Sequence, residues 1–411
     1  MLTLLASLAC TKADDPGTDE VTWTQDVQPL MAQHCLRCHT AGAMSPLTLD
    51  SYEQASVIAG TIAESVSERR MPPHIADNSG ACQTYQDHGQ WLEDDAIAAF
   101  VDWAEAGAPQ GPEQEPVAAV QTQGLQDPSA VLAPPQPYAP DFSGGDDWRC
   151  FVLEVNPGTE TRYLQAYEVI PERVERVHHV TLFKPINSQT ADIARGLDDG
   201  GGYTCFGDAG VPGALVGVWS AGRRTFTYPE GTGVPIEPGI PVIMQIHYTP
   251  DGEDGLATTT RMAVQLEDQA RPLYPLWLLN DNFTLQPDTP DQWDSESGTI
   301  REALNEFSLY DVQGELEVIG TAGHMHLLGS ALHIDIEHES GGETCLLDIR
   351  RFDYNWHDVF LLETPVPVTD RDTIQMDCAW DTTGVDQTVS WGDGIDEEMC
   401  VALLLTSPRE D

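Results

Sequence analysis

The chain has 411 residues and a formal net charge of −48 at pH 7, with 19 Lys and Arg against 67 Asp and Glu. This length favours two to four domains over a single core. The charge argues strongly against a nucleic-acid partner, because phosphate binding needs clustered basic side chains and the sequence has no basic stripe.

The first ten residues form a short apolar run that ends in small residues and Cys10, after which the chain becomes polar and acidic. Residues 1–10 resemble a bacterial lipoprotein signal, in which the cysteine is lipidated. The departures are the lack of a preceding basic residue and the small Ser7. We expect an exported bacterial protein, periplasmic or on the outer membrane or cell surface, attached to the membrane only through this lipid.

A haem attachment signature follows the first predicted helix. Residues 24–38 have helical periodicity, with Thr24 as the candidate N-cap, and they run into Cys35-Leu36-Arg37-Cys38-His39. In this signature two thiols bind the haem vinyl groups and the adjacent imidazole ligates the iron. A redox dithiol and half of a zinc site are the alternatives.

Met71 is the expected second axial ligand, because a thioether is a common partner of histidine in c-type cytochromes. Met44 and His74 are the alternatives. Residues 51–68 are helical in pattern, and a further amphipathic helix starts near residue 94 and ends at Gly107.

Residues 20–110 thus resemble a small class I cytochrome c, which implies an all-α haem domain with covalent haem c. Residues 111–143 are rich in Pro, Gln and Ala, which is typical of a linker. Beyond residue 144, short runs of Val, Ile, Leu and Thr broken by turn residues favour β-sandwich domains.

Several histidines lie in strand-like runs of this second part. His178 and His179 are adjacent, so regular alternation would send them to opposite faces, and joint metal binding requires a bulge, a strand end or unequal use of the ring nitrogens. His247 lies in the strand-like run 242–249 and shares a face with Gln245.

The segment Thr321 to Gly329 contains His324 and His326, whose side chains emerge on one face of a strand. Two imidazoles can chelate copper or zinc when other ligands complete the site. Met399 precedes the apolar strand 401–405 and is core filler if it is considered alone.

The order His-His, Gln-x-His-Tyr, His-x-His and Glu-Met-Cys, over residues 146–406, resembles the copper type II, ascorbate-dependent monooxygenases. The resemblance implies two jelly-roll-like sandwiches, 144–270 and 271–411, each with one copper ion. The expected fold class is therefore multidomain: a small all-α cytochrome c-like domain followed by two all-β sandwich domains.

The resemblance also implies the ligands. His178, His179 and His247 would bind an electron-transfer copper, and His324, His326 and Met399 the catalytic copper. Three imidazoles suit both oxidation states, and two imidazoles with a thioether favour Cu(I). Gln245 is a candidate for supporting a metal-binding histidine on the side away from the metal.

In this family a disulfide lies beside the methionine ligand, which implies that Cys378 pairs with Cys400. Cys150 with Cys205 is the next expected pair, and Cys82 and Cys345 have no assigned partner. The remaining histidines are expected to be surface or structural residues, and the acidic run 396–398 a solvated loop. These histidines are His34, His88, His333, His338 and His357.

Ala322 stands where the peptide-processing branch has a substrate-binding arginine, and Val401 and Leu403 replace polar residues of that branch. A neutral, apolar or aromatic small molecule is therefore the expected substrate. We predict a monooxygenase that hydroxylates an activated C–H bond with O2, with electrons from ascorbate or from a donor protein through the haem. The alternative is a non-catalytic haem and copper electron relay or copper-binding protein.

Overall fold

The structure is a computed structural model of the chain. It describes residues 20–409 except 42, 44, 87–89, 116, 118–123, 221–224, 251–254, 307–313, 355, 357, 393 and 395. The signal segment with Cys10, and also Met44, His88 and His357, lie outside the described residues. The chain divides into two compact units: 1–40, 47–72 and 92–120 form the N-terminal unit, and 41–46, 73–91 and 121–411 form the C-terminal unit.

The N-terminal unit is built from short helical segments. They are η1 (Trp23–Val27), α1 (Gln28–Leu30), η2 (Met31–Cys35), α2 (Tyr52–Val57), α3 (Ala59–Ser67) and α4 (Asp94–Glu105). The first three follow one another directly and end at Cys35, so the helix expected over 24–38 begins one residue earlier, after Thr22, and stops three residues sooner. Trp23, Phe100 and Trp103 are buried in the core of this unit.

The expected fold class is wrong. The described residues are mostly β-sheet with few helices, and no self-contained all-α domain is evident over residues 20–110. The helices are short, and residues 73–91 leave the N-terminal unit to join the C-terminal one. Helical periodicity indicated the segments correctly, but it carries no information on where the chain between them packs.

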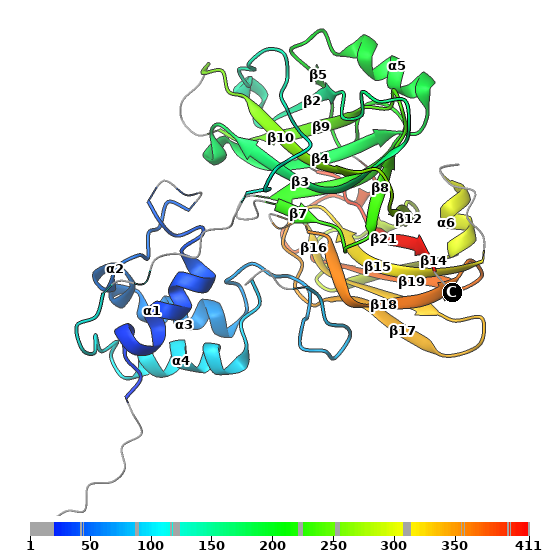
Figure 1. The fold of residues 1–411 in the computed structure, drawn as a ribbon. Helices are drawn as coiled ribbons and strands as arrows, with labels where there is room; N and C mark the ends of the chain where they lie inside the picture. The colour runs from blue at the N-terminus through cyan, green and yellow to red at the C-terminus, as the bar shows by residue number, and fades with distance from the viewer. Residues whose placement is uncertain are drawn as a thin grey trace, which may run out of the picture. The chain divides into compact units, whose positions relative to one another are not determined.

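The first β-sandwich of the C-terminal unit consists of two sheets packed face to face (Figure 1). One has the order β5 (Tyr203–Thr204), β2 (Asp147–Leu153), β9 (Val242–Tyr248), β4 (Val177–Pro185), β6 (Gly213–Ser220). The other has β1 (Ala130–Leu132), β10 (Thr260–Glu267), β3 (Arg162–Pro171), β8 (Thr232–Ile236) and β11 (Arg271–Pro272), with β7 (Thr225–Thr227) beside β3. Strand β1 lies within the stretch expected to be a linker. The short helices η3 (Phe142–Gly144), η4 (Val174–Arg176) and α5 (Ser188–Leu197) also belong to this part.

The second β-sandwich pairs two four-stranded sheets. The first is β12 (Tyr274–Leu279), β21 (Val401–Pro408), β15 (Glu315–His324) and β18 (Phe360–Thr369), and the second is β14 (Gln292–Thr299), β19 (Thr373–Trp380), β16 (Gly329–Glu337) and β17 (Glu343–Ile349). The pair β13 (Thr284–Leu285) and β20 (Val389–Ser390) and the helix α6 (Ile300–Glu306) complete it.

The two sandwiches share one hydrophobic cluster. Ile319, Leu403 and Leu405, from β15 and β21 of the second sandwich, are buried together with the core residues of the first. Burying each such side chain stabilises the assembly by about 1.5–3 kcal/mol. The sandwiches therefore hold side chains from β4, β9, β15 and β21 in fixed relation to one another.

Segment 73–91 is fastened to the second sandwich. Cys82 forms a disulfide with Cys345 of β17, and the Tyr85 hydroxyl donates to the carbonyl of Leu346 at 2.9 Å. The sequence left both cysteines unassigned because they are separated by 263 positions. The other two disulfides, Cys150–Cys205 and Cys378–Cys400, confirm the expected pairs.

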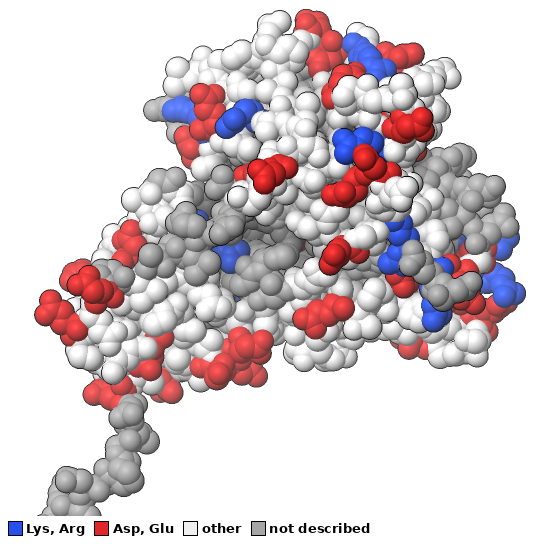
Figure 2. Space-filling view, viewed as in Figure 1, with Lys and Arg blue, Asp and Glu red and all other residues white. Residues whose placement is uncertain are grey.

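Acidic side chains are scattered over the face of the molecule shown in Figure 2, and the few Lys and Arg side chains lie among them. Arg162 pairs with Asp268 and Arg195 with Glu154, for example. Among the described residues, no helix is long and apolar enough to span a membrane.

Candidate functional site

Three histidines converge at the ends of β4 and β9. The ladder between these strands pairs Val177 with Tyr248 and His179 with His247, so His178 is an extra residue at a β-bulge. A bulge turns a side chain from its regular face, and it solves the geometric problem that adjacent histidines pose. One ring nitrogen from each of His178, His179 and His247 lies within 4.8 Å of the others.

His247 is held in one orientation by two neighbours. Its Nε2 donates to the Asp146 carboxylate at 2.8 Å, and the Trp148 ring stacks on it at 3.8 Å between centroids, with an interplanar angle of 9°. Burial lowers the pKa of His247 to about 4, against the opposing effect of Asp146. The ring is therefore neutral near pH 7, as a metal ligand must be.

The donor set of this three-histidine site fits a copper ion. The Nδ1 atom of His247 is buried without a hydrogen-bond partner, and a buried polar atom left unpaired is costly unless something binds it. The Nδ1 atoms of His178 and His179 lie 3.0 Å apart in the same space. Three converging imidazole nitrogens, one of them fixed by a carboxylate behind it, are a set that copper or zinc accepts.

His324, His326 and Met399 come together in the second sandwich, near the end of β15 and the start of β21. Strand β15 ends at His324, which pairs with Val401 of β21 in an antiparallel ladder. Continuing that register past the strand ends brings His326 opposite Met399. The His324 and His326 rings are 5.3 Å apart between centroids, and His326 Nδ1 donates to the carbonyl of Glu397 at 3.0 Å, which leaves Nε2 for a metal.

Glu398 anchors this thioether site, and its environment corrects the expectation of a solvated acidic loop. Its side chain is 0% exposed and accepts hydrogen bonds from the backbone N–H groups of His326 (3.0 Å) and Leu328 (2.6 Å) and from Trp380 Nε1 (3.1 Å). Burial raises the pKa of Glu398, and the two backbone hydrogen bonds oppose that shift. The disulfide Cys378–Cys400 holds the residue after Met399.

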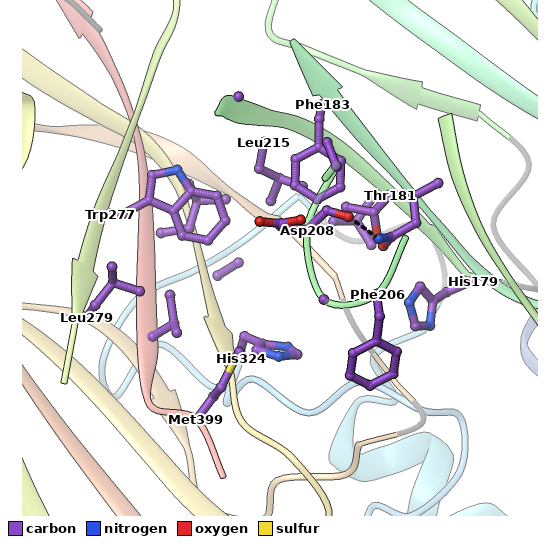
Figure 3. Close-up of a pocket in the computed structure, with 18 of the residues that line it drawn as sticks. His179, Thr181, Phe183, Phe206, Asp208, Leu215, Trp277, Leu279, His324 and Met399 are labelled. Carbon is purple, nitrogen blue, oxygen red and sulfur yellow. Dashed lines mark hydrogen bonds between the residues drawn. The ribbon is translucent and has the colours of Figure 1, made fainter. Parts of the chain in front are cut away.

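Both sites border one cavity of about 670 Å³, a size typical of small-molecule sites. His179 lines it from the first sandwich, and His324, His326 and Met399 line it from the second. Figure 3 shows His324 and Met399 next to each other, facing the same space as His179 and Phe206. Apolar and aromatic side chains cover much of the wall: Phe183, Leu215, Trp277, Leu279, Val401 and Leu403.

Gln245 supports the cavity rather than a histidine. Its Nε2 donates to the Asp208 carbonyl at 2.6 Å, a contact drawn in Figure 3. Asp208 and Phe206 lie on the loop after Cys205, whose disulfide to Cys150 fixes the start of that loop. The residues that line the cavity, as far as the structure describes them, include Asp208 and Asp358 but no Lys or Arg.

The haem signature lies just after η2 in the N-terminal unit. Cys35 and Cys38 are free cysteines, and His39 Nδ1 donates to the carbonyl of Leu47 at 2.9 Å. Burial raises the pKa of Cys35 to about 12, aided by the neighbouring Cys38.

Met71 lies on the loop after α3 in the same unit and is 38% exposed. His74 belongs to the C-terminal unit, where its ring contacts Trp91 and Phe360 edge-on at 5.7 and 5.4 Å. That packing disfavours His74 as an iron ligand.

Sequence reasoning missed the residues that support the ligands. Asp146, Trp148 and Tyr354 lie in no recognisable motif, and only folding brings them to the histidines. Glu398 could have been suspected from its position directly before Met399. His333 pairs with Asp335 at 2.8 Å, and His338 pairs with Asp372 at 3.2 Å.

Comparisons with known proteins bear on the C-terminal unit. Residues 305–408 match the family model "Copper type II ascorbate-dependent monooxygenase, C-terminal domain". The chain is 24% identical over 251 residues to DBH-like monooxygenase protein 1 of Homo sapiens and 24% identical over 250 residues to that of Gallus gallus. Each match covers 57% of this chain, and the chain spans 39% of the length of these relatives.

Among solved structures, infectious bursal disease virus, Gt strain, is 12% identical with a TM-score of 0.18, covering 71% of this chain and 75% of that one. A TM-score this low carries no argument. The family match and the two relatives support a relation of this chain to the copper type II ascorbate-dependent monooxygenases. That family binds copper and uses ascorbate.

Proposed function

We propose that this chain hydroxylates an activated C–H bond of a small organic molecule, with O2 as the oxidant and two copper ions as cofactors. The observation that carries the proposal is that one cavity is lined by His179 of the converging three-histidine set and by all three residues of the second set, His324, His326 and Met399. One set is closed and all-imidazole, and the other includes a thioether and faces the cavity. A relay protein needs no substrate-sized cavity beside its second metal.

The ligands proposed for copper have different tasks. His178, His179 and His247 hold the ion that stores an electron, with His247 kept neutral and oriented by Asp146. His324, His326 and Met399 hold the second ion. Bound copper would supply O2 activation and one-electron chemistry at an open coordination position.

The proposed substrate is neutral and largely apolar or aromatic. Ala322, Val401 and Leu403 line the cavity where the peptide-processing branch of the family has its polar substrate contacts. An anionic substrate would have to approach Asp208 and Asp358 with no basic side chain among the described lining residues. Apart from the proposed copper ions, no described lining residue would offset the charge of such a substrate.

We further propose that haem c is attached at Cys35 and Cys38, with His39 and Met71 as axial ligands. The free cysteines and the hydrogen bond that holds the His39 ring through Nδ1 support this assignment. The haem would pass electrons from a donor protein or a small reductant such as ascorbate. The signal-like residues 1–10 support export to the periplasm or cell surface with a lipid at Cys10, and the acidic composition supports the absence of a nucleic-acid partner.

The test begins with a copper and haem inventory of the purified full-length protein. We expect two copper ions and one covalent haem per chain. O2 uptake and product formation are then measured with ascorbate and a panel of neutral aromatic, aliphatic and carboxylate-bearing compounds of similar size. Hydroxylated product from the neutral members supports the proposal.

Two outcomes would contradict it. A measured content of one copper ion or none per chain would contradict the two-copper mechanism. Copper that cycles between oxidation states without forming product from any compound would favour the alternative, a non-catalytic electron relay.

A further inference from the structure

Tyr354 contacts a histidine of each candidate copper site. It lies between β17 and β18 and lines the cavity. Its ring is 6.3 Å from that of His178 between centroids, with an interplanar angle of 23°, and 6.2 Å from that of His326, at 87°. One side chain of the second sandwich therefore reaches both sites.

The electrostatic surroundings of Tyr354 support the same placement. Burial raises the pKa of its hydroxyl, and so do the charges of Asp146 and Glu398. Asp146 is the carboxylate that holds His247, and Glu398 is the one that holds the His326 backbone. The phenol group therefore lies within reach of carboxylates that belong to both sites.

Electrons need a path between the two sites. His178 and His326 are far apart in the sequence, so the covalent chain offers no short connection. The direct route crosses the cavity, and electronic coupling decays faster across a gap than through atoms in van der Waals contact. The Tyr354 ring lies beside a histidine of each site, 6.3 Å from His178 and 6.2 Å from His326 between centroids, and so shortens the gap that an electron must cross.

We propose that the aromatic ring of Tyr354 is the path by which an electron passes from the three-histidine site to the His324/His326/Met399 site. This inference rests on the proposed function, in which both sites hold copper. One electron leaves the first ion and one arrives at the second. Tyr354 relays it through its π system without being oxidised, and no bond is made or broken. A one-electron donor replaces the electron, and O2 is the final acceptor.

The path can be tested without substrate, so the test is independent of turnover. The copper-loaded full chain is reduced and placed under carbon monoxide, which caps the open, thioether-containing Cu(I) ion. Two equivalents of ferricyanide then oxidise the haem and the three-histidine site, and the ion capped by carbon monoxide stays reduced. A laser flash removes the carbon monoxide, and transient infrared absorption follows its rebinding.

In the unaltered protein we expect two rebinding phases, because an electron that has moved to the three-histidine site must return before carbon monoxide rebinds. Tyr354→Leu is expected to reduce the amplitude of the slow phase by about tenfold or more, because an electron transfer that is tenfold slower no longer competes with rebinding of carbon monoxide. Tyr354→Phe keeps the ring and should retain the slow phase. Trp277→Leu, which removes an aromatic ring from the same cavity, is the matched control and should also retain it.

The proposal that the ring is the path would be overturned if the slow phase survives in Tyr354→Leu or is lost in Tyr354→Phe. Absence of the slow phase from the unaltered protein would overturn it as well. Copper content and Cu(II) spectra of the variants, compared with those of the unaltered protein, show whether the sites are intact. Tyr354→Gln replaces the leucine variant if that variant does not fold. If the unaltered protein binds fewer than two copper ions, the proposed function itself has failed, which is a distinguishable result.

Discussion

The two candidate copper sites border the same cavity but are fixed in different ways. In the three-histidine site, His179 and His247 lie within paired strands, and Asp146 and Trp148 hold the His247 ring directly. In the thioether site, His326 and Met399 lie beyond the ends of their strands and are held through their backbone. The first arrangement suits an ion that only changes charge, and the second leaves a face open for a reaction.

The largest expected effect separates the two sites by their metal. His326→Ala removes a ligand of the thioether site, and His247→Ala removes one from the three-histidine site. Each variant is expected to bind one copper ion per chain instead of two, as counted by metal analysis. Neither should form measurable product, but only His326→Ala should lose carbon monoxide binding by the reduced protein. Carbon monoxide binding that survives in His326→Ala would contradict the assignment of the open site.

The next effect concerns how the thioether site is held. Glu398→Ala would leave the His326 and Leu328 N–H groups and Trp380 Nε1 without their buried acceptor, at a cost of about 3–5 kcal/mol. We expect at least a 10–100-fold weaker second copper ion, as is usual when a supporting residue is lost, with the first unaffected.

Asp396→Ala is the matched control for Glu398, because Asp396 is an exposed acid of the same run. Copper titration followed by EPR measures both affinities, and urea unfolding measures stability. Equal effects of the two substitutions would mean that the charge of the run matters, rather than the buried hydrogen bonds.

The sequence indicated the ligands of both sites but not what holds them. His178, His179, His247, His324, His326 and Met399 were found because they occur in ordered local motifs. Glu398 was misjudged because two exposed acids precede it, and Asp146 was missed because it meets His247 across a strand pair, 101 positions away. Local patterns report which atoms can bind a metal, whereas burial and long-range contacts depend on the folded chain.

The fold followed the same rule. Short strands beyond residue 144 were predicted from their composition, and a bulge was one of three ways considered for the adjacent histidines to bind one metal, of which the structure shows the bulge at His178. The all-α domain was predicted wrongly, since the periodicity of separate helices cannot reveal that residues 73–91 leave them. Cys82–Cys345, which fixes that segment, joins positions too distant for any spacing argument.

A pH effect of up to about 3 kcal/mol is expected at the three-histidine site. The pKa of His247 is lowered to about 4 in the folded protein, from an ordinary value near 6.5. Between these values the unfolded chain binds the extra proton, so stability rises with pH across this window and is lost as pH falls toward 4.

Urea unfolding of the metal-free protein between pH 4 and 7 measures this effect, with His247→Gln as the comparison. The variant should show a flatter dependence in that window. An identical slope in both proteins would mean that His247 is not held neutral by burial.

The smallest effect tests whether the His247 ring depends on stacking as well as on its hydrogen bond. Trp148→Leu removes the ring stacked at 3.8 Å and should cost about 1 kcal/mol. That corresponds to a roughly fivefold weaker first copper ion, with no change at the thioether site. Trp293→Leu, at a tryptophan that is 56% exposed, controls for loss of an indole.

Asp146→Asn should weaken copper binding at the same three-histidine site by about 10–100-fold. If Trp148→Leu weakens copper binding more than Asp146→Asn does, packing rather than the carboxylate orients the His247 ring. The three-histidine site would then differ from the thioether site by the van der Waals contacts of its side chains rather than by their hydrogen bonds.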